Sequence, residues 1–116
     1  MTTYNTSTTK VSEEAIKNIV ANGDAKEWKN PRTGATRYYI NEEGLSNIIS
    51  LVQTRYNSGN ISGVSYIDED GDKMTVAHSR GYFYNDKTYI EDGIVYSTWA
   101  PYGANIAELI AHNLAK

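Results

Sequence analysis

The sequence predicts an α+β fold in which an antiparallel sheet of about five to seven strands packs with two or three helices. Two observations indicate this class. Apolar residues recur at helical spacing in three segments, and short runs rich in Tyr, Val and Ile, bounded by Gly, Asn and Asp, lie between them. With 116 residues, of which 40% are hydrophobic, the chain is long enough for one core. We therefore expect residues 11–116 to form a single domain.

The first ten residues are rich in Thr, Ser and Asn, and we expect residues 1–10 to form a disordered tail. They lack the apolar segment of a signal peptide, and no apolar run approaches the roughly 20 residues that a membrane helix needs. We therefore expect a cytoplasmic protein without a membrane partner. The chain contains no cysteine, which excludes disulfides, thiolate metal sites and thiol catalysis.

We expect the first helix to begin after Ser12, whose side chain can cap it, and to end at Asn22-Gly23. The segment 26–41 follows, with two strand-like runs around an Asn-Pro-Arg-Thr-Gly turn. It carries four of the eleven cationic residues and one of the two tryptophans. This hairpin is therefore where we expect either core or contact surface.

A second helix is expected to begin after Asn41 and to run for three to four turns, until the segment 57–60 stops it. We expect it to lie across the sheet as the main core helix. Its apolar stripe consists of Leu45, Ile48, Ile49, Val52 and Tyr56.

The rest of the chain is expected to form strands and a closing helix. The pair Asp70-Gly71 predicts a type I′ hairpin turn, in which both central residues need a positive φ. The turn at Glu91-Asp92-Gly93 is expected to lead into the last strand. The expected elements are strands 64–67 and 73–78, a second hairpin from 82–84 and 87–90, a strand over 94–99, and a helix over 104–115.

Catalysis would need a positioned base, and the chain offers two histidines, His78 and His112. Ser79 follows His78 directly, but neighbours in a strand point to opposite faces, so the two do not form a natural dyad. We therefore predict a protein that is not an enzyme. The run at 68–72 alternates carboxylates. An EF-hand requires three acids at alternate positions before its glycine and a glutamate six residues after it, and the run has only two such acids and no such glutamate. We predict no metal and no cofactor.

Charge is divided unevenly along the chain. Residues 1–66 carry a net charge of +1 and residues 67–116 a net charge of −4, which favours a basic protein partner. The acidic run is either an ordinary solvated turn or a rigid anionic tip that occupies an arginine-lined groove as phosphates would. Ten tyrosines against one phenylalanine supply amphipathic rings that suit a protein interface. The predicted partner-binding residues are Asp68, Glu69, Asp70, Asp72, Tyr84, Asp86, Tyr89, Glu91 and Asp92.

The alternative is nucleic-acid binding by the basic, aromatic hairpin. Positive charge and stackable rings are what single-stranded nucleic acid requires, but no RNP-type or GXXG motif accompanies them and the net charge is −3. The residues for this alternative are Lys26, Trp28, Lys29, Arg32 and Arg37. Aromatic residues on paired strands are also common as cross-strand packing. A symmetric homodimer through an exposed sheet face is compatible with either function.

One stretch, residues 26–41, combines a distinctive set of residues: Lys26, Trp28, Arg37, Tyr38, Tyr39, Ile40 and Asn41. With this pattern the chain resembles small proteins of phages and other mobile elements. Several of these are anti-CRISPR inhibitors, which are compact, acidic, cysteine-poor α+β domains that block a Cas nuclease. The resemblance implies a non-catalytic inhibitor that acts in the cytoplasm of a bacterial host. It would act as a DNA mimic in the nucleic-acid or PAM-reading groove of a CRISPR-Cas effector. The resemblance assigns no functional residue.

Overall fold

The computed structural model describes residues 4–59, 61–77, 87–98 and 105–115. Within these ranges, three helices and eight strands form two antiparallel sheets, which confirms the predicted α+β class. The elements are β1 (Asn5–Thr6), α1 (Glu13–Ala21), β2 (Ala25–Lys29), β3 (Thr36–Ile40), α2 (Glu42–Ile49), β4 (Val52–Arg55), β5 (Ile61–Ile67), β6 (Lys73–Ala77), β7 (Thr88–Glu91), β8 (Ile94–Ser97) and α3 (Ile106–Leu114).

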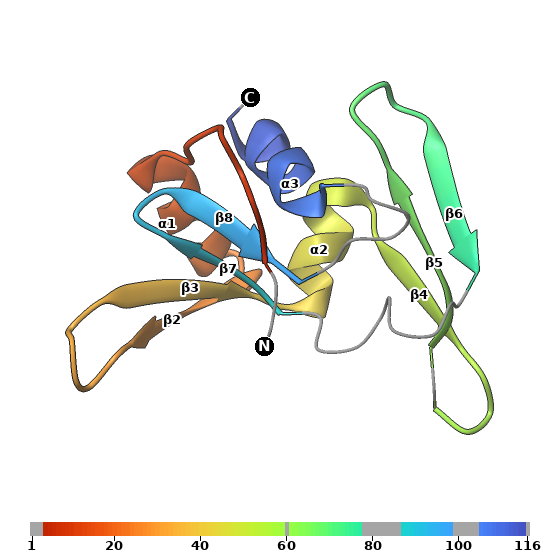
Figure 1. Ribbon diagram of the computed structural model, residues 1–116, viewed down its shortest axis with the longest axis horizontal. Helices are drawn as coiled ribbons and strands as arrows, with labels where there is room; N and C mark the ends of the chain where they lie inside the picture. The colour runs from red at the N-terminus through yellow and green to blue at the C-terminus, as the bar shows by residue number, and fades with distance from the viewer. Residues whose placement is uncertain (1–3, 60, 78–86, 99–104, 116) are drawn as a thin grey trace.

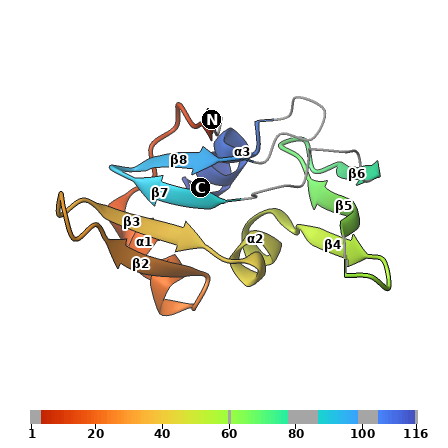
Figure 2. The same ribbon diagram turned by 60° about the horizontal axis from the view of Figure 1, so that its bottom comes forward.

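The larger sheet has five strands in the order β1-β8-β7-β3-β2, and the smaller sheet has three in the order β4-β5-β6. Figure 1 shows the two sheets at opposite ends of the long axis, with α2 and α3 between them. In Figure 2 the five-stranded sheet faces the viewer, and α1 and α3 lie behind it. Helices α1 and α3 therefore cover one face of the larger sheet.

The core lies where this covered face meets the helices. Ile90 of β7, Val95 of β8 and Ile110 of α3 are completely buried in it. Val64 and Tyr66 of β5 extend the same cluster into the smaller sheet. Burial of these side chains supplies the main favourable term in folding.

The helix starts follow the predicted capping chemistry. The hydroxyl of Ser12 accepts a hydrogen bond from the Ala15 amide at 3.2 Å, and the side chain of Asn41 accepts one from the Gly44 amide at 2.7 Å. Asn41 also donates to the carbonyl of Gly23 at 2.7 Å. One side chain thus joins the end of α1 to the start of α2.

The second helix is shorter than predicted. It ends at Ile49, because Ser50 adopts a left-handed backbone conformation with φ 55° and the chain continues into β4. Val52 and Tyr56, which the helical pattern placed in the core, are 52% and 58% exposed. Pairing of β4 with the next strand, β5, completes the three-stranded sheet, and this pairing overrides the local helical period.

The N-terminal segment also differs from the expectation of a disordered tail over residues 1–10. Asn5–Thr6 pairs with β8 as the fifth strand of the larger sheet. The buried hydroxyl of Ser7 accepts a hydrogen bond from the Val95 amide at 3.0 Å. The polar residues that indicated disorder therefore satisfy backbone groups at the edge of β8.

The two Asp-Gly turns behave differently. At Asp70-Gly71 only the glycine has a positive φ, so the predicted type I′ turn is wrong there, although β5 and β6 do form a hairpin. At Asp92-Gly93, between β7 and β8, both residues have a positive φ, 54° and 80°. That pair adopts the type I′ conformation. The predicted hairpin partner at 82–84 lies outside the described residues.

Candidate functional site

The face of the five-stranded sheet that points away from α1 and α3 carries a cluster of aromatic rings. Because side chains alternate along a strand, the buried Ile90 and Val95 place Tyr89 and Tyr96 on this opposite face. Cross-strand pairing brings Tyr39 beside Tyr89, and Trp28 beside Arg37. The residues of this surface, called the aromatic face below, are Tyr4, Trp28, Arg37, Tyr39, Tyr89, Glu91 and Tyr96.

Three tyrosines from three adjacent strands form the centre of the aromatic face. The Tyr39 and Tyr89 ring centroids are 5.5 Å apart, and the Tyr89 and Tyr96 rings are stacked at 5.0 Å. Tyr4 meets the Tyr89 ring edge-on at 5.5 Å. Tyr89 is consequently only 6% exposed, and burial raises the pKa of its phenol. Its ring supports the surrounding rings and offers almost no contact area itself.

Arg37 is held rigidly against these rings. Its Nε donates to Glu91 Oε1 at 2.8 Å, and one of its terminal nitrogens donates to the Tyr39 hydroxyl at 3.2 Å. Its guanidinium carbon lies 4.3 Å from the centroid of the Tyr89 ring and 5.9 Å from that of Trp28. The hydrogen bonds to Glu91 and then Tyr39 raise the pKa of Arg37, so it stays charged. Its charge is paired with that of Glu91 within the face.

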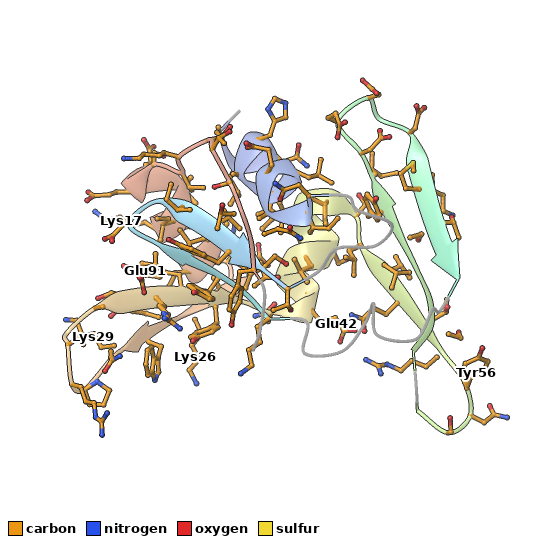
Figure 3. The ribbon with its side chains drawn as sticks, in the orientation of Figure 1. Lys17, Lys26, Lys29, Glu42, Tyr56 and Glu91 are labelled. Carbon is orange, nitrogen blue, oxygen red and sulfur yellow. The ribbon has the colours of Figure 1, made fainter. Side chains whose placement is uncertain are left out.

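Trp28 is the most exposed large ring of the aromatic face, at 41%. It lies on the outer strand β2, with its ring centroid 6.1 Å from that of Tyr39. Lys26 shares its side of the strand and is exposed (Figure 3). Rigid aromatic area with a cationic rim is thus available at one side of the aromatic face.

The structure brings together residues from both predicted sites. Tyr89 and Glu91 came from the acidic, tyrosine-rich set, while Trp28 and Arg37 came from the basic hairpin, and all four belong to the aromatic face. The near-complete burial of Tyr89 argues against its predicted role as a direct contact residue. Neither predicted set of contact residues includes Tyr4, Tyr39 or Tyr96. Only the strand order places these rings on one face, since it pairs Tyr39 with Tyr89, which lies 50 residues later in the chain.

The remaining predicted contact residues lie elsewhere. Lys29 ends β2 and Arg32 follows in the turn, and both are exposed. Asp92 is exposed in the turn between β7 and β8. Tyr84 and Asp86 lie outside the described residues.

The acidic run belongs to the other sheet, in the turn between β5 and β6 at the top of Figure 1. Carboxylate oxygens of Asp68, Asp70 and Asp72 lie within 4.8 Å of one another, so these three residues could share a hard cation. Asp68 Oδ1 already accepts hydrogen bonds from the backbone amides of Asp70 and Asp72, at 3.0 and 2.9 Å. The carboxylate of Asp68 therefore shapes the turn. Glu69 is exposed at its tip.

The histidines form no part of the aromatic face. His112 is exposed in the last turn of α3, while His78 and Ser79 lie outside the described ranges.

A groove of about 990 Å³ lies on the helix side of the larger sheet, between α1, the β2–β3 hairpin and the β7–β8 turn. Its lining is of mixed charge and includes Lys10, Glu13, Lys17, Val20, Glu27, Tyr38 and Asp92.

Comparison with known proteins gives no relative. No protein-family model matches the sequence, and no curated protein or solved structure is significantly similar to it. No helix in the described ranges is long and apolar enough to span a membrane.

Proposed function

We propose that this protein is a non-enzymatic protein-binding module that contacts its partner through the exposed part of the aromatic face. The observation that carries the proposal is the clamped Trp28–Arg37–Tyr39 group. Trp, Tyr and Arg are the residue types that contribute most energy at protein interfaces. A side chain that is already fixed by its neighbours loses little conformational entropy on binding. This group meets both conditions.

The charge of the aromatic face favours a protein over nucleic acid as the partner. Binding to phosphates depends on free cationic groups, but Arg37 forms an ion pair with Glu91 at 2.8 Å. The whole chain carries a net charge of −3, which opposes approach to a polyanion. A protein surface with an apolar pocket and modest charge fits this face better.

The class of partner is proposed from the resemblance to phage inhibitors. We take the partner to be a CRISPR-Cas effector in the bacterial cytoplasm. The acidic run at 68–72 provides a second, separate surface that could meet cationic residues of such an effector. It lies on the smaller sheet, away from the aromatic face (Figure 1).

The experiment measures the affinity of the purified protein for candidate effectors by biolayer interferometry, after nuclease treatment. Trp28→Ala should weaken binding at least about tenfold, because it removes the most exposed ring of the group. Tyr56→Ala is the matched control, since Tyr56 is also exposed but lies at the far end of the molecule (Figure 3). Equal affinities for wild type and Trp28→Ala would refute the assignment of this face.

The acidic run has its own test, in an assay of effector inhibition. Changing Asp68, Glu69, Asp70 and Asp72 together to Asn or Ser should weaken inhibition if the run mimics phosphates. Retained potency in a folded variant would remove the run from the interface. Circular dichroism is needed as a control for folding, because Asp68 also shapes its turn.

One observation favours the second candidate function, binding of single-stranded nucleic acid. Exposed Trp28 lies beside Lys26, with Lys29 and Arg32 further along the same hairpin. If these groups bind a strand, the affinity should fall steeply with salt, and joint replacement of Lys29, Arg32 and Arg37 should abolish it. Salt-insensitive binding, or none, would exclude this alternative.

A further inference from the structure

The outer edge of the larger sheet is formed by β2, which pairs on one side with β3 and has no partner strand on its other side among the described residues (Figure 2). Two backbone hydrogen bonds fix which groups face β3. The Asn41 amide donates to the Asp24 carbonyl at 3.0 Å, and the Asn30 amide donates to the Ala35 carbonyl at 2.8 Å.

In an antiparallel pair, hydrogen-bonded positions recur at every second residue. The backbone amides and carbonyls of residues 24 and 30 point toward β3, so those of residues 26 and 28 between them do as well. The amides and carbonyls of Ala25, Glu27 and Lys29 therefore point to the free edge. Another strand can form backbone hydrogen bonds with these outward positions.

Edge strands are commonly protected from pairing by charged side chains. The charges on β2 are arranged differently, because they are self-complementary. Glu27 and Lys29 both occupy outward positions, and both side chains lie on the helix side of the sheet and are exposed. Trp28 lies between them on the aromatic face. A second copy of β2, running antiparallel, can place opposite charges opposite each other.

We infer that β2 pairs with β2 of a second copy of this chain, about a two-fold axis at Trp28. Glu27 then lies opposite Lys29 of the partner subunit, and the reverse pair forms on the other side of the axis. Trp28 lies opposite Trp28 of the partner subunit at a non-hydrogen-bonded position, where side chains are closest. The two five-stranded sheets become one continuous sheet.

The charges select this register over its neighbours. A shift of two residues in one direction places Glu27 opposite Glu27 of the partner subunit. The same shift in the other direction places Lys29 opposite Lys29 of the partner subunit. Like charges directly opposite each other are destabilising. Only the register centred on Trp28 forms two Glu–Lys pairs.

The test is sedimentation velocity of the full chain from about 1 μM to about 1 mM, the range of a weak to moderate dimer. Wild type should show a concentration-dependent monomer–dimer equilibrium. Glu27→Lys and Lys29→Glu should each raise the dissociation constant by about tenfold or more, because either change turns both opposite-charge pairs into like-charge pairs. Glu69→Lys makes the same charge change as Glu27→Lys, but on the other sheet, and should leave the dimer intact.

The sharpest result comes from mixing the two single variants. Glu27→Lys carries only positive charge at positions 27 and 29, and Lys29→Glu carries only negative charge there. The mixture should therefore form a heterodimer, although each variant alone is monomeric. The double variant Glu27→Lys, Lys29→Glu should recover the wild-type dimer. A wild type that stays monomeric throughout, or single variants that dimerise as wild type does, would overturn the inference. Partner binding by the aromatic face is measured separately, since Glu27 and Lys29 lie on the other side of the sheet.

Discussion

Glu108 provides the most precise test of how the N-terminal segment is held to the domain. Its Oε1 accepts hydrogen bonds from the Thr8 amide at 2.9 Å and from the Thr8 hydroxyl, and its Oε2 accepts one from the Thr9 amide at 3.4 Å. These bonds, that of the Thr8 hydroxyl above all, lower the pKa of Glu108 from 4.5 to about 2. The carboxylate on α3 therefore fixes the segment that follows β1.

The contribution of Glu108 to stability follows from the linkage between its protonation and folding. One pKa unit corresponds to about 1.36 kcal/mol, so the full shift would contribute about 3 kcal/mol to the free energy of unfolding. Glu108 is only partly buried, and solvent screening reduces this value to about 1 to 2 kcal/mol. Because the folded pKa is the lower one, the contribution is present above pH 4.5 and is lost as the pH falls toward about 2.

The assay is urea unfolding of wild type and Glu108→Gln at several pH values between 7 and 2, followed by circular dichroism. We expect Glu108→Gln to be less stable by about 1 to 2 kcal/mol at pH 7, and the two proteins to converge near pH 2. Glu69→Gln, at an exposed position, is the control. A difference in unfolding free energy that does not change with pH would refute the reasoning. A double-mutant cycle with Thr8→Ala should assign the coupling to this pair.

Three further predictions concern the stability of other positions, and each is measured by thermal and urea unfolding. Ser50→Gly should stabilise the protein by about 0.5 to 1 kcal/mol, since glycine adopts the left-handed conformation without strain; unchanged or lower stability would contradict this. Gly44→Ala should destabilise it by about 1 to 3 kcal/mol, because the new Cβ would lie 2.2 Å from the Asp24 carbonyl oxygen. A neutral effect would show that α2 and the residue before β2 move apart without cost. Tyr89→Ala should cost about 3 kcal/mol or more, whereas the exposed Trp28→Ala should cost about 1 kcal/mol or less. Similar costs at both positions would contradict the central role of Tyr89.

Local chemistry in the sequence predicted the element boundaries that depend on a few neighbouring residues. Ser12 and Asn41 cap their helices because their side chains reach amides three residues on. The β2–β3 hairpin formed as predicted, with Gly34 at a positive φ in its turn. The fold class followed from the same periodicities, because alternation and helical spacing are properties of contiguous segments.

Tertiary pairing decided the features for which local patterns were ambiguous or silent. Val52 and Tyr56 fitted a helical stripe, yet β4 gains more by completing the three-stranded sheet with β5. The Thr- and Ser-rich N-terminus looked disordered, yet Asn5–Thr6 pairs with β8. Both outcomes depend on strand partners outside the segment itself: β5, the next strand, for β4, and β8, about 90 residues away, for Asn5–Thr6.

The candidate site shows the same division. Trp28 and Arg37 on the hairpin, and Tyr89 and Glu91 near the C-terminus, were predicted as rival surfaces because the sequence gives no strand order. The order β8-β7-β3-β2 places them on one face and pairs Arg37 with Glu91. Residue types and helix caps were therefore determined by the sequence alone. The single surface and its balanced charge were decided by the tertiary structure, because non-local strand pairing sets which side chains meet.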